Sequence, residues 1–274
     1  MFEFMLAPFV ACMLLVAIHS YLGLHVIARE VIFVDLALAQ MAALGTVTGM
    51  LLGVHPGADT NYVFAFGFVA LGAALFALTR TSGRGRVPHE AIIGIVYVVA
   101  TAAALLLADK APQGAEAIRD ILVGSIIWVT WPTILKHLAL PYLLLGLFHW
   151  FFRHRFLTIS FHPEEAAARG WNIRWWDFLF YLSFGSVIIF SVPIGGVLMV
   201  FTFLVVPAAI AFLFTRQMRL LSIISWSSGA LASLLGLWLS YKYDLPTGPL
   251  IVCTYGAVLL GAGVVQRFVV KEAA

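Results

Sequence analysis

Apolar residues recur along the chain in runs of about 20 residues, the length that an α-helix needs to cross the hydrocarbon core of a bilayer. Short polar breaks separate the runs. The pattern predicts nine spanning helices, near residues 5–27, 31–53, 61–79, 90–108, 134–152, 177–193, 195–214, 219–240 and 249–267. We therefore expect an all-α, polytopic membrane protein in which residues 1–274 form a single transmembrane domain.

A tenth apolar stretch, ILVGSIIWVTWP at residues 121–132, is too short to cross a bilayer and stops at Pro132. We expect a short helix here. The sequence leaves open whether it lies on the membrane surface or dips into the membrane.

Composition supports a membrane protein, and the placement of the cations predicts which side of the membrane each loop faces. Hydrophobic residues make up 62% of the 274 residues and charged residues only 11%, whereas about a quarter of an ordinary globular domain is charged. With the N-terminus outside, twelve of the 16 Lys and Arg fall in inner loops, as the positive-inside rule requires. These twelve are Arg29, Arg80, Arg84, Arg86, Arg153, Arg155, Arg169, Arg174, Arg216, Arg219, Arg267 and Lys271. The C-terminus is then cytoplasmic. The basic pI reflects the cations of the inner loops, and we expect no nucleic-acid partner.

Small residues and prolines predict how the helices pack. Gly45, Gly49 and Gly53 recur four apart in GTVTGMLLG, a spacing that lets another helix approach closely. Pro207 removes a hydrogen bond inside the seventh span and should kink it. The segment SVPIGG should break the chain between the sixth and seventh spans.

Motifs of enzymes are missing from the sequence. Cys12 and Cys253 have no CxxC or zinc spacing, and we expect them to be packing thiols. A zinc protease needs HExxH, but His89 and Glu90 are followed by Ile93 where the second histidine belongs. We expect a transport protein without enzymatic activity of its own.

The longest inner loop, RHRFLTISFHPEEAAARGWNIRWWD at about 153–176, contains a helix signal. Pro163 starts a helix well, Glu164 and Glu165 suit its positive N-terminal end, and alanines such as Ala166 propagate it until Gly170. The pattern predicts a short, water-exposed helix, which is either a solvated connector or a docking helix for a cytoplasmic partner.

Several stretches resemble the ABC-3 family, the membrane subunits of bacterial metal-uptake ABC transporters of the zinc, manganese and iron type. HPEEAAARG, GGVLMVFTFLVVPAAIAFL and YDLPTGPLIV resemble three of its segments. YLGLHVIAREVIFVDLALAQMAALG aligns without a gap to its first conserved segment, and EAIIGIVYVVATAAALLL resembles its fourth helix. The resemblance covers nearly the whole chain.

The resemblance implies a type II importer in the bacterial inner membrane. Two permease copies would form a homodimer that works with two cytoplasmic ATPases and an extracytoplasmic binding protein. Glu164, Ala166 and Gly170 match the family's coupling helix, although His162 stands where the family usually has Asp before Pro163. The chain has no GxxxxGK[ST] loop to bind ATP phosphates. We therefore expect that this chain binds no cofactor and that the partner subunit uses the ATP. The alternative is an ATPase-independent secondary transporter or channel, since an intramembrane acid is common there.

The metal pathway of the relatives carries an Asp and a His four residues apart, and the gapless alignment places Leu36 and Gln40 at these positions. The acid here, Asp35, comes one residue earlier, so Asp35 and Gln40 point about 140° apart on a helix. Asp35 could instead pair with the helix N-terminus or with Arg29. His19 lies deep in a span, where an unpaired imidazole is costly. Gln40, Asp35 and His19 are the candidate pathway residues, and we expect a pathway that lacks the usual tight zinc or manganese site.

Overall fold

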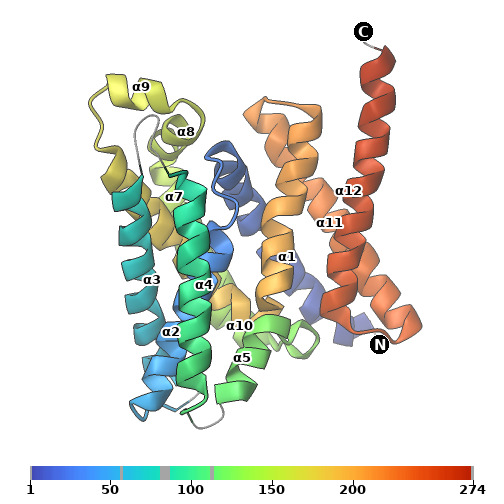
Figure 1. Ribbon diagram of the computed structural model, residues 1–274. Helices are drawn as coiled ribbons and strands as arrows, with labels where there is room; N and C mark the ends of the chain where they lie inside the picture. The colour runs from blue at the N-terminus through green and yellow to red at the C-terminus, as the bar shows by residue number, and fades with distance from the viewer. Residues whose placement is uncertain (1, 56–57, 81–86, 112–113, 273–274) are drawn as a thin grey trace. The chain divides into compact units, whose positions relative to one another are not determined.

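A computed structural model describes residues 2–55, 58–80, 87–111 and 114–272, and the regular structure in these residues is helical (Figure 1). The helices are α1 (Phe2–Ala28), α2 (Val34–Leu51), α3 (Asp59–Thr79), α4 (His89–Ala108), α5 (Gly114–Val123), the single turn η1 (Ile126–Trp128), α6 (Trp131–Thr133), the π-helical η2 (Ile134–Ala139), α7 (Leu140–Phe151), α8 (Arg153–Phe161), α9 (Pro163–Ala168), α10 (Ile173–Phe214), α11 (Met218–Tyr243) and α12 (Thr247–Glu272).

The nine predicted spans are confirmed in the described part of the chain. Eight helical stretches are long and apolar enough to cross a membrane, and one of them, α10, has 42 residues. At 1.5 Å per residue α10 would be about 63 Å long, twice the hydrocarbon thickness. Gly196 leaves the helical conformation, with φ 75° and ψ 155°. This residue divides α10 into two spans, at the SVPIGG segment where the sequence predicted a break.

The chain divides into two compact units. Residues 28–122 and 143–193 form one, here called the α2–α4 unit, and the remaining residues form the other, here called the α11–α12 unit. Each unit is described separately below.

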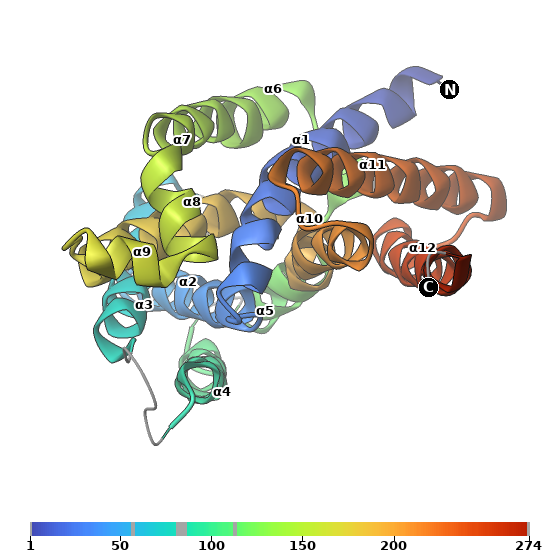
Figure 2. The same cartoon turned by 90° about the horizontal axis from the view of Figure 1, so that it is seen from above.

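In the α2–α4 unit, α2 packs against both α3 and α4 (Figures 1 and 2). Gly45 and Gly49 lie in the contact with α3. A Cβ on Gly45 would come within 2.9 Å of the Ala65 Cα, and one on Gly49 would come within 3.0 Å of the Phe64 ring. At Gly45 the two helix backbones therefore approach to a distance that only glycine allows, whereas at Gly49 the neighbours are side chains.

Gly53 has a different role from the packing role predicted for it. No described atom outside its own neighbourhood lies within 4 Å of where its Cβ would be, and its φ is +86°. Its N–H donates to the Met50 carbonyl, and the Val54 N–H donates to the Gly49 carbonyl. This pattern is a Schellman motif, so Gly53 ends α2 because glycine adopts the left-handed conformation without strain.

In the α11–α12 unit, α11 and α12 lie side by side (Figure 2). The Tyr255 hydroxyl donates to the Gly229 carbonyl at 2.8 Å and also bonds to the Ser233 hydroxyl. Pro207 is buried, and a Cβ on Gly229 would lie 3.3 Å from the Pro207 ring. Helix α10 continues through Pro207 to Phe214.

The tenth apolar stretch does not form the single short helix that we expected over residues 121–132. Helix α5 starts earlier and ends at Val123, and Gly124 follows with φ +68°. The Ser125 N–H then donates to the Ile194 carbonyl at 2.9 Å. A backbone bonded to the break in α10 cannot complete its own helical ladder, and only the turn η1 forms next.

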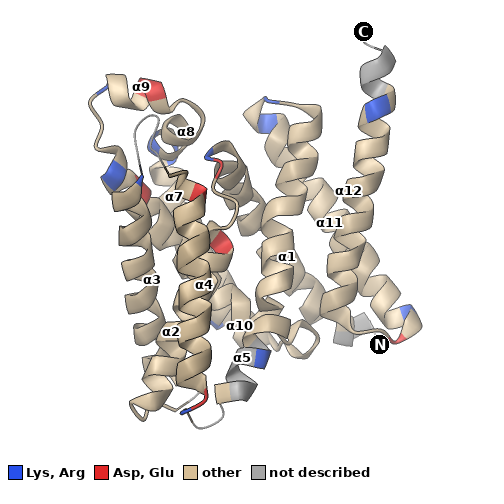
Figure 3. Ribbon diagram, in the orientation of Figure 1, with Lys and Arg blue, Asp and Glu red and all other residues tan. Residues whose placement is uncertain are grey.

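The two ends of the α2–α4 unit differ in charge. Helix α9 lies at one end and the α2–α3 connection at the other (Figure 1). Acidic and basic residues of this unit gather toward the α9 end (Figure 3). The sidedness of the loops, with the α9 end facing the cytoplasm, stays a prediction from the cations of the sequence.

Cysteine labelling in intact cells tests this sidedness. Cys12 is buried as expected of a packing thiol, but Cys253 is exposed, so both are first replaced by serine. We expect a membrane-impermeant thiol reagent to label His55→Cys, whereas Glu164→Cys should react only after permeabilisation. His55 and Glu164 are both exposed, so a difference in labelling reports the side of the membrane and not burial in the protein. Strong labelling of Glu164→Cys in intact cells would contradict the orientation.

Candidate translocation and coupling site

Two of the candidate pathway residues lie on α2. Asp35 is in the first turn and only 1% exposed, and Gln40 is buried on the same helix. Among the described residues, the Asp35 Oδ1 has no hydrogen-bond partner. A buried carboxylate oxygen without a donor is costly unless a ligand or cation meets it.

Asp35 does not pair with Arg29, as the sequence had suggested it could. The Arg29 guanidinium instead contacts Asp177, which lies far along the chain. The start of α2 has no cap from its own side chains. Glu90 at the start of α4 supplies one, because its Oε1 accepts the Phe33 N–H at 2.8 Å. Arg29 is therefore paired with another carboxylate, and Glu90 rather than Asp35 bonds to the Phe33 N–H.

His19 lies in α1, in the α11–α12 unit, and is completely buried. Its Nδ1 lies 2.8 Å from the Leu15 carbonyl, to which it can only donate. In the neutral ring this leaves Nε2 as the nitrogen with a lone pair, and Nε2 has no partner among the described residues. The arrangement is one that a neutral imidazole uses to bind a metal ion.

The three candidates do not all belong to the same unit. Asp35 and Gln40 belong to one unit and His19 to the other. Within the described residues, no three His, Cys, Asp or Glu side chains are grouped in a way that could hold a metal ion. Within the described part of each unit, the candidate donors therefore stand singly and not in a group of three.

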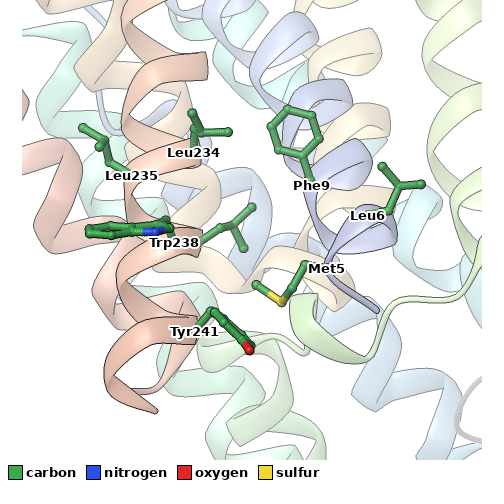
Figure 4. Close-up of a pocket in the computed structure, with 8 residues that line it drawn as sticks. Met5, Leu6, Phe9, Leu234, Leu235, Trp238 and Tyr241 are labelled. Carbon is green, nitrogen blue, oxygen red and sulfur yellow. The ribbon is translucent and has the colours of Figure 1, made fainter. Parts of the chain in front are cut away.

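A groove in the α11–α12 unit, between α1 and α11, has a volume of about 640 Å³ (Figure 4). Its lining is aliphatic and aromatic: Met5, Leu6, Phe9, Leu234, Leu235, Leu237, Trp238 and Tyr241. None of these residues is a carboxylate or an imidazole, so the groove does not suit a divalent cation.

The short helix predicted in this loop is present as α9, which starts at Pro163 and ends at Ala168. Gly170 follows with φ +70°, which suits a glycine that stops a helix. Ala166 is fully buried, whereas Glu164 and Glu165 in the first turn are exposed. Helix α9 thus presents an acidic face to water and is anchored through its small residue.

Helix α8 and its aromatic neighbours hold α9 in place, and the sequence pattern did not predict this helix. The Arg169 guanidinium bonds to the His154 ring at 3.1 Å and pairs with Glu165. Arg155 on α8 lies 4.2 Å from the centre of the Trp171 ring, within cation–π range. The loop therefore forms a helical hairpin of α8 and α9, held together by side-chain contacts.

The sequence pattern also did not single out Asp177, which is completely buried near the start of α10. The sequence feature that could have identified it is an acid at the beginning of an apolar span. A charge there costs free energy and usually has a function.

Comparison with known proteins agrees with this architecture. The model of the ABC 3 transport family matches residues 1–266. The manganese transport system membrane protein MntC of Listeria innocua is 27% identical over 205 residues, which cover 73% of this chain and 72% of that protein. The manganese import system permease protein ScaB of Streptococcus gordonii is 24% identical over 94% of this chain and 90% of its own.

Among solved structures, PsaBC from Streptococcus pneumoniae in complex with Fab superimposes with a TM-score of 0.80 at 21% identity, covering 99% of this chain and 96% of that one. An inward-facing putative metal-chelate type ABC transporter gives a TM-score of 0.64, also at 21% identity, over 96% of this chain and 85% of its own. With the family match over residues 1–266, the chain belongs to the ABC 3 transport family, as a multi-pass membrane permease.

Proposed function

We propose that the chain is the membrane-spanning permease subunit of an ABC importer that moves a divalent metal ion, or a small metal complex, into the cell. The observation that carries this proposal is the ordered, exposed helix α9 in a chain of the ABC 3 transport family. A helix tied at both ends to membrane spans can transmit a push from a cytoplasmic ATPase, and the chain has no phosphate-binding loop with which to hydrolyse ATP itself.

The partners follow from the same proposal. Two copies of the permease form a homodimer in the bacterial inner membrane, with the N-terminus outside and the C-terminus in the cytoplasm. Two ATPase subunits dock on the cytoplasmic side, and an extracytoplasmic protein delivers the substrate. The twelve inner cations support this orientation.

A metal substrate is supported by the names of the relatives, which transport manganese. The candidate donors for such an ion are the Asp35 carboxylate, the Gln40 amide and the His19 Nε2. Carboxylate and amide oxygens suit hard cations such as Mn²⁺, and an imidazole also binds softer ones. With Leu36 and Gln40 in place of the paired Asp and His, the chain passes its ion through weaker, separate contacts.

Uptake into proteoliposomes tests the function. The permease is reconstituted with its ATPase and binding protein, and radioactive Mn²⁺ is measured inside the vesicles. We expect uptake only with ATP, and none with a hydrolysis-deficient ATPase. Full uptake by the permease without an ATPase would show the alternative, a secondary transporter or channel.

Substitution of Asp35 tests the pathway. We expect Asp35→Asn to fold, because an amide of the same shape removes the cost of a buried, unpartnered charge. Metal uptake should fall by about tenfold or more, the loss that follows when a contact supporting a metal site is removed. Gln40→Leu should also reduce uptake.

The matched control is Asp109→Asn, which neutralises an exposed aspartate elsewhere in the same unit and should leave uptake unchanged. Unchanged uptake in Asp35→Asn would show that Asp35 is not a pathway ligand.

A further inference from the structure

We propose that Asp177, Arg29 and Arg80 form a joint, here called the Asp177 node, that positions the α8–α9 hairpin relative to α2 and so sets how much transport each ATP drives. The inference rests on the proposed function, because it assigns the step between the ATPase and the pathway. Asp177 and Arg80 act through other groups and are positioning residues.

The node is held by direct contacts within the α2–α4 unit. The Asp177 Oδ1 accepts a hydrogen bond from the Arg29 Nη1 at 2.7 Å, and its Oδ2 accepts one from the Arg80 Nη1. The Arg29 Nε donates to the Ser160 hydroxyl at 2.7 Å, and the guanidinium lies 3.9 Å from the centre of the Phe180 ring. One buried carboxylate thus binds two cations, and one of these cations also bonds to a hydroxyl.

The contacts join four separate segments. Arg29 lies in the link between α1 and α2, shortly before Asp35, and Arg80 caps the end of α3. Ser160 lies on α8, next to the docking helix, and Asp177 lies near the start of α10, where the chain leaves the hairpin. A displacement of the hairpin is therefore carried to the start of α2 through polar contacts.

The two arms of the node differ. The Arg29 side chain is 2% exposed and is fixed by Asp177, Ser160 and Phe180, whereas the Arg80 side chain is 22% exposed and has Asp177 as its one ion-pair partner among the described residues. Removing Arg29 would take a buried cation from Asp177 and a hydrogen-bond donor from the Ser160 hydroxyl. Removing Arg80 leaves Asp177 still paired with Arg29, so it loosens the joint without unfolding the unit.

For stability alone, a buried cluster of charges such as the Asp177 node would be unfavourable in free energy. Two guanidinium groups share one carboxylate, so the site carries an excess positive charge at low solvent exposure. Packed apolar residues often stabilise a protein as well as a buried ion pair does, but they do not fix one relative position of helices through directional bonds. The directional arrangement is what a transmitting joint needs.

The test uses the reconstituted complex with Arg80→Gln, and it measures ATP hydrolysis, metal uptake and thermal stability. We expect hydrolysis and the unfolding midpoint to stay close to wild type, while the ATP consumed per imported ion rises about fivefold or more, the lower end of typical coupling effects. Arg80→Lys keeps the charge and the single contact, and should restore coupling. Lys110→Gln removes an exposed ion pair with Asp109 and serves as the control.

A parallel fall of hydrolysis, uptake and thermal stability would make the node merely structural and overturn the inference, as would normal coupling in Arg80→Gln. Hydrogen exchange gives a readout that does not depend on transport. Arg80→Gln should increase amide exchange in residues 28–35 and 153–162 at an unchanged unfolding midpoint, and equal exchange in both proteins would overturn the joint. A wild-type complex that imports no metal with ATP would instead contradict the proposed function.

Discussion

Gly196→Ala is expected to leave little folded protein in the membrane. Gly196 has φ 75° and ψ 155°, a conformation that is essentially restricted to glycine and costs other residues about 1–3 kcal/mol. A Cβ there would also lie 2.6 Å from the Val123 carbonyl oxygen and 2.7 Å from the Gly124 nitrogen. Because these are backbone atoms, no side-chain rotation relieves the clash, and the segment after α5 must leave the break in α10.

The measurement is the yield and the unfolding midpoint of the solubilised protein. Gly124→Ala should behave in the same way, because its Cβ would meet the backbone of Gly195 and Gly196. The control is Gly256→Ala in α12, where no described atom outside its own neighbourhood lies within 4 Å of the new Cβ. Alanine favours a helix over glycine by about 1 kcal/mol, so the control should be at least as stable as wild type. Equal midpoints for Gly196→Ala and Gly256→Ala would contradict the role of the glycine contact.

Glu164→Arg is expected to abolish most uptake while the protein still folds. Glu164 is exposed in the first turn of α9, so its replacement disturbs no buried contact. If α9 binds in a groove of the ATPase, the groove surface opposite Glu164 carries a complementary positive charge. Arginine at position 164 then places two like charges together, which costs several kcal/mol. Uptake should fall at least about tenfold at normal protein yield.

The experiment compares metal uptake, ATP hydrolysis and membrane abundance. Gln217→Arg is a matched control, because it adds the same cation at an exposed position between α10 and α11, in another loop predicted to face the cytoplasm. Hydrolysis that continues without uptake in Glu164→Arg would be the signature of a broken coupling contact. Normal uptake would reduce α9 to a solvated connector.

Local signals made the spans and the short helix α9 predictable from the sequence. Long apolar runs determine where a chain crosses a membrane, since the backbone there must satisfy its own hydrogen bonds. Pro163 and Gly170 bound α9 through their own backbone preferences. The break in α10 was predictable for the same reason, because Gly196 follows another glycine and a nearby proline in SVPIGG.

Contacts between distant residues were not predictable in this way. The sequence suggested Arg29 as a partner for Asp35 because the two are close along the chain, but Arg29 bonds to Asp177, which lies 148 residues away. Gly53 shares the four-residue spacing of Gly45 and Gly49, but α2 ends just before it, so the spacing no longer describes one helix face. The periodic pattern gives the helix and its face, whereas tertiary packing decides which residue stands opposite.

The groove between α1 and α11 bears on how the protein behaves once it leaves the bilayer. A space of about 640 Å³ with aliphatic and aromatic walls gives water no hydrogen-bond partners. In a detergent micelle an alkyl tail is the species that can fill it, and the rings of Trp238 and Tyr241 line the same wall (Figure 4). We therefore expect the length and bulk of the detergent tail to affect the packing of α1 against α11, and with it the stability of this unit in solution.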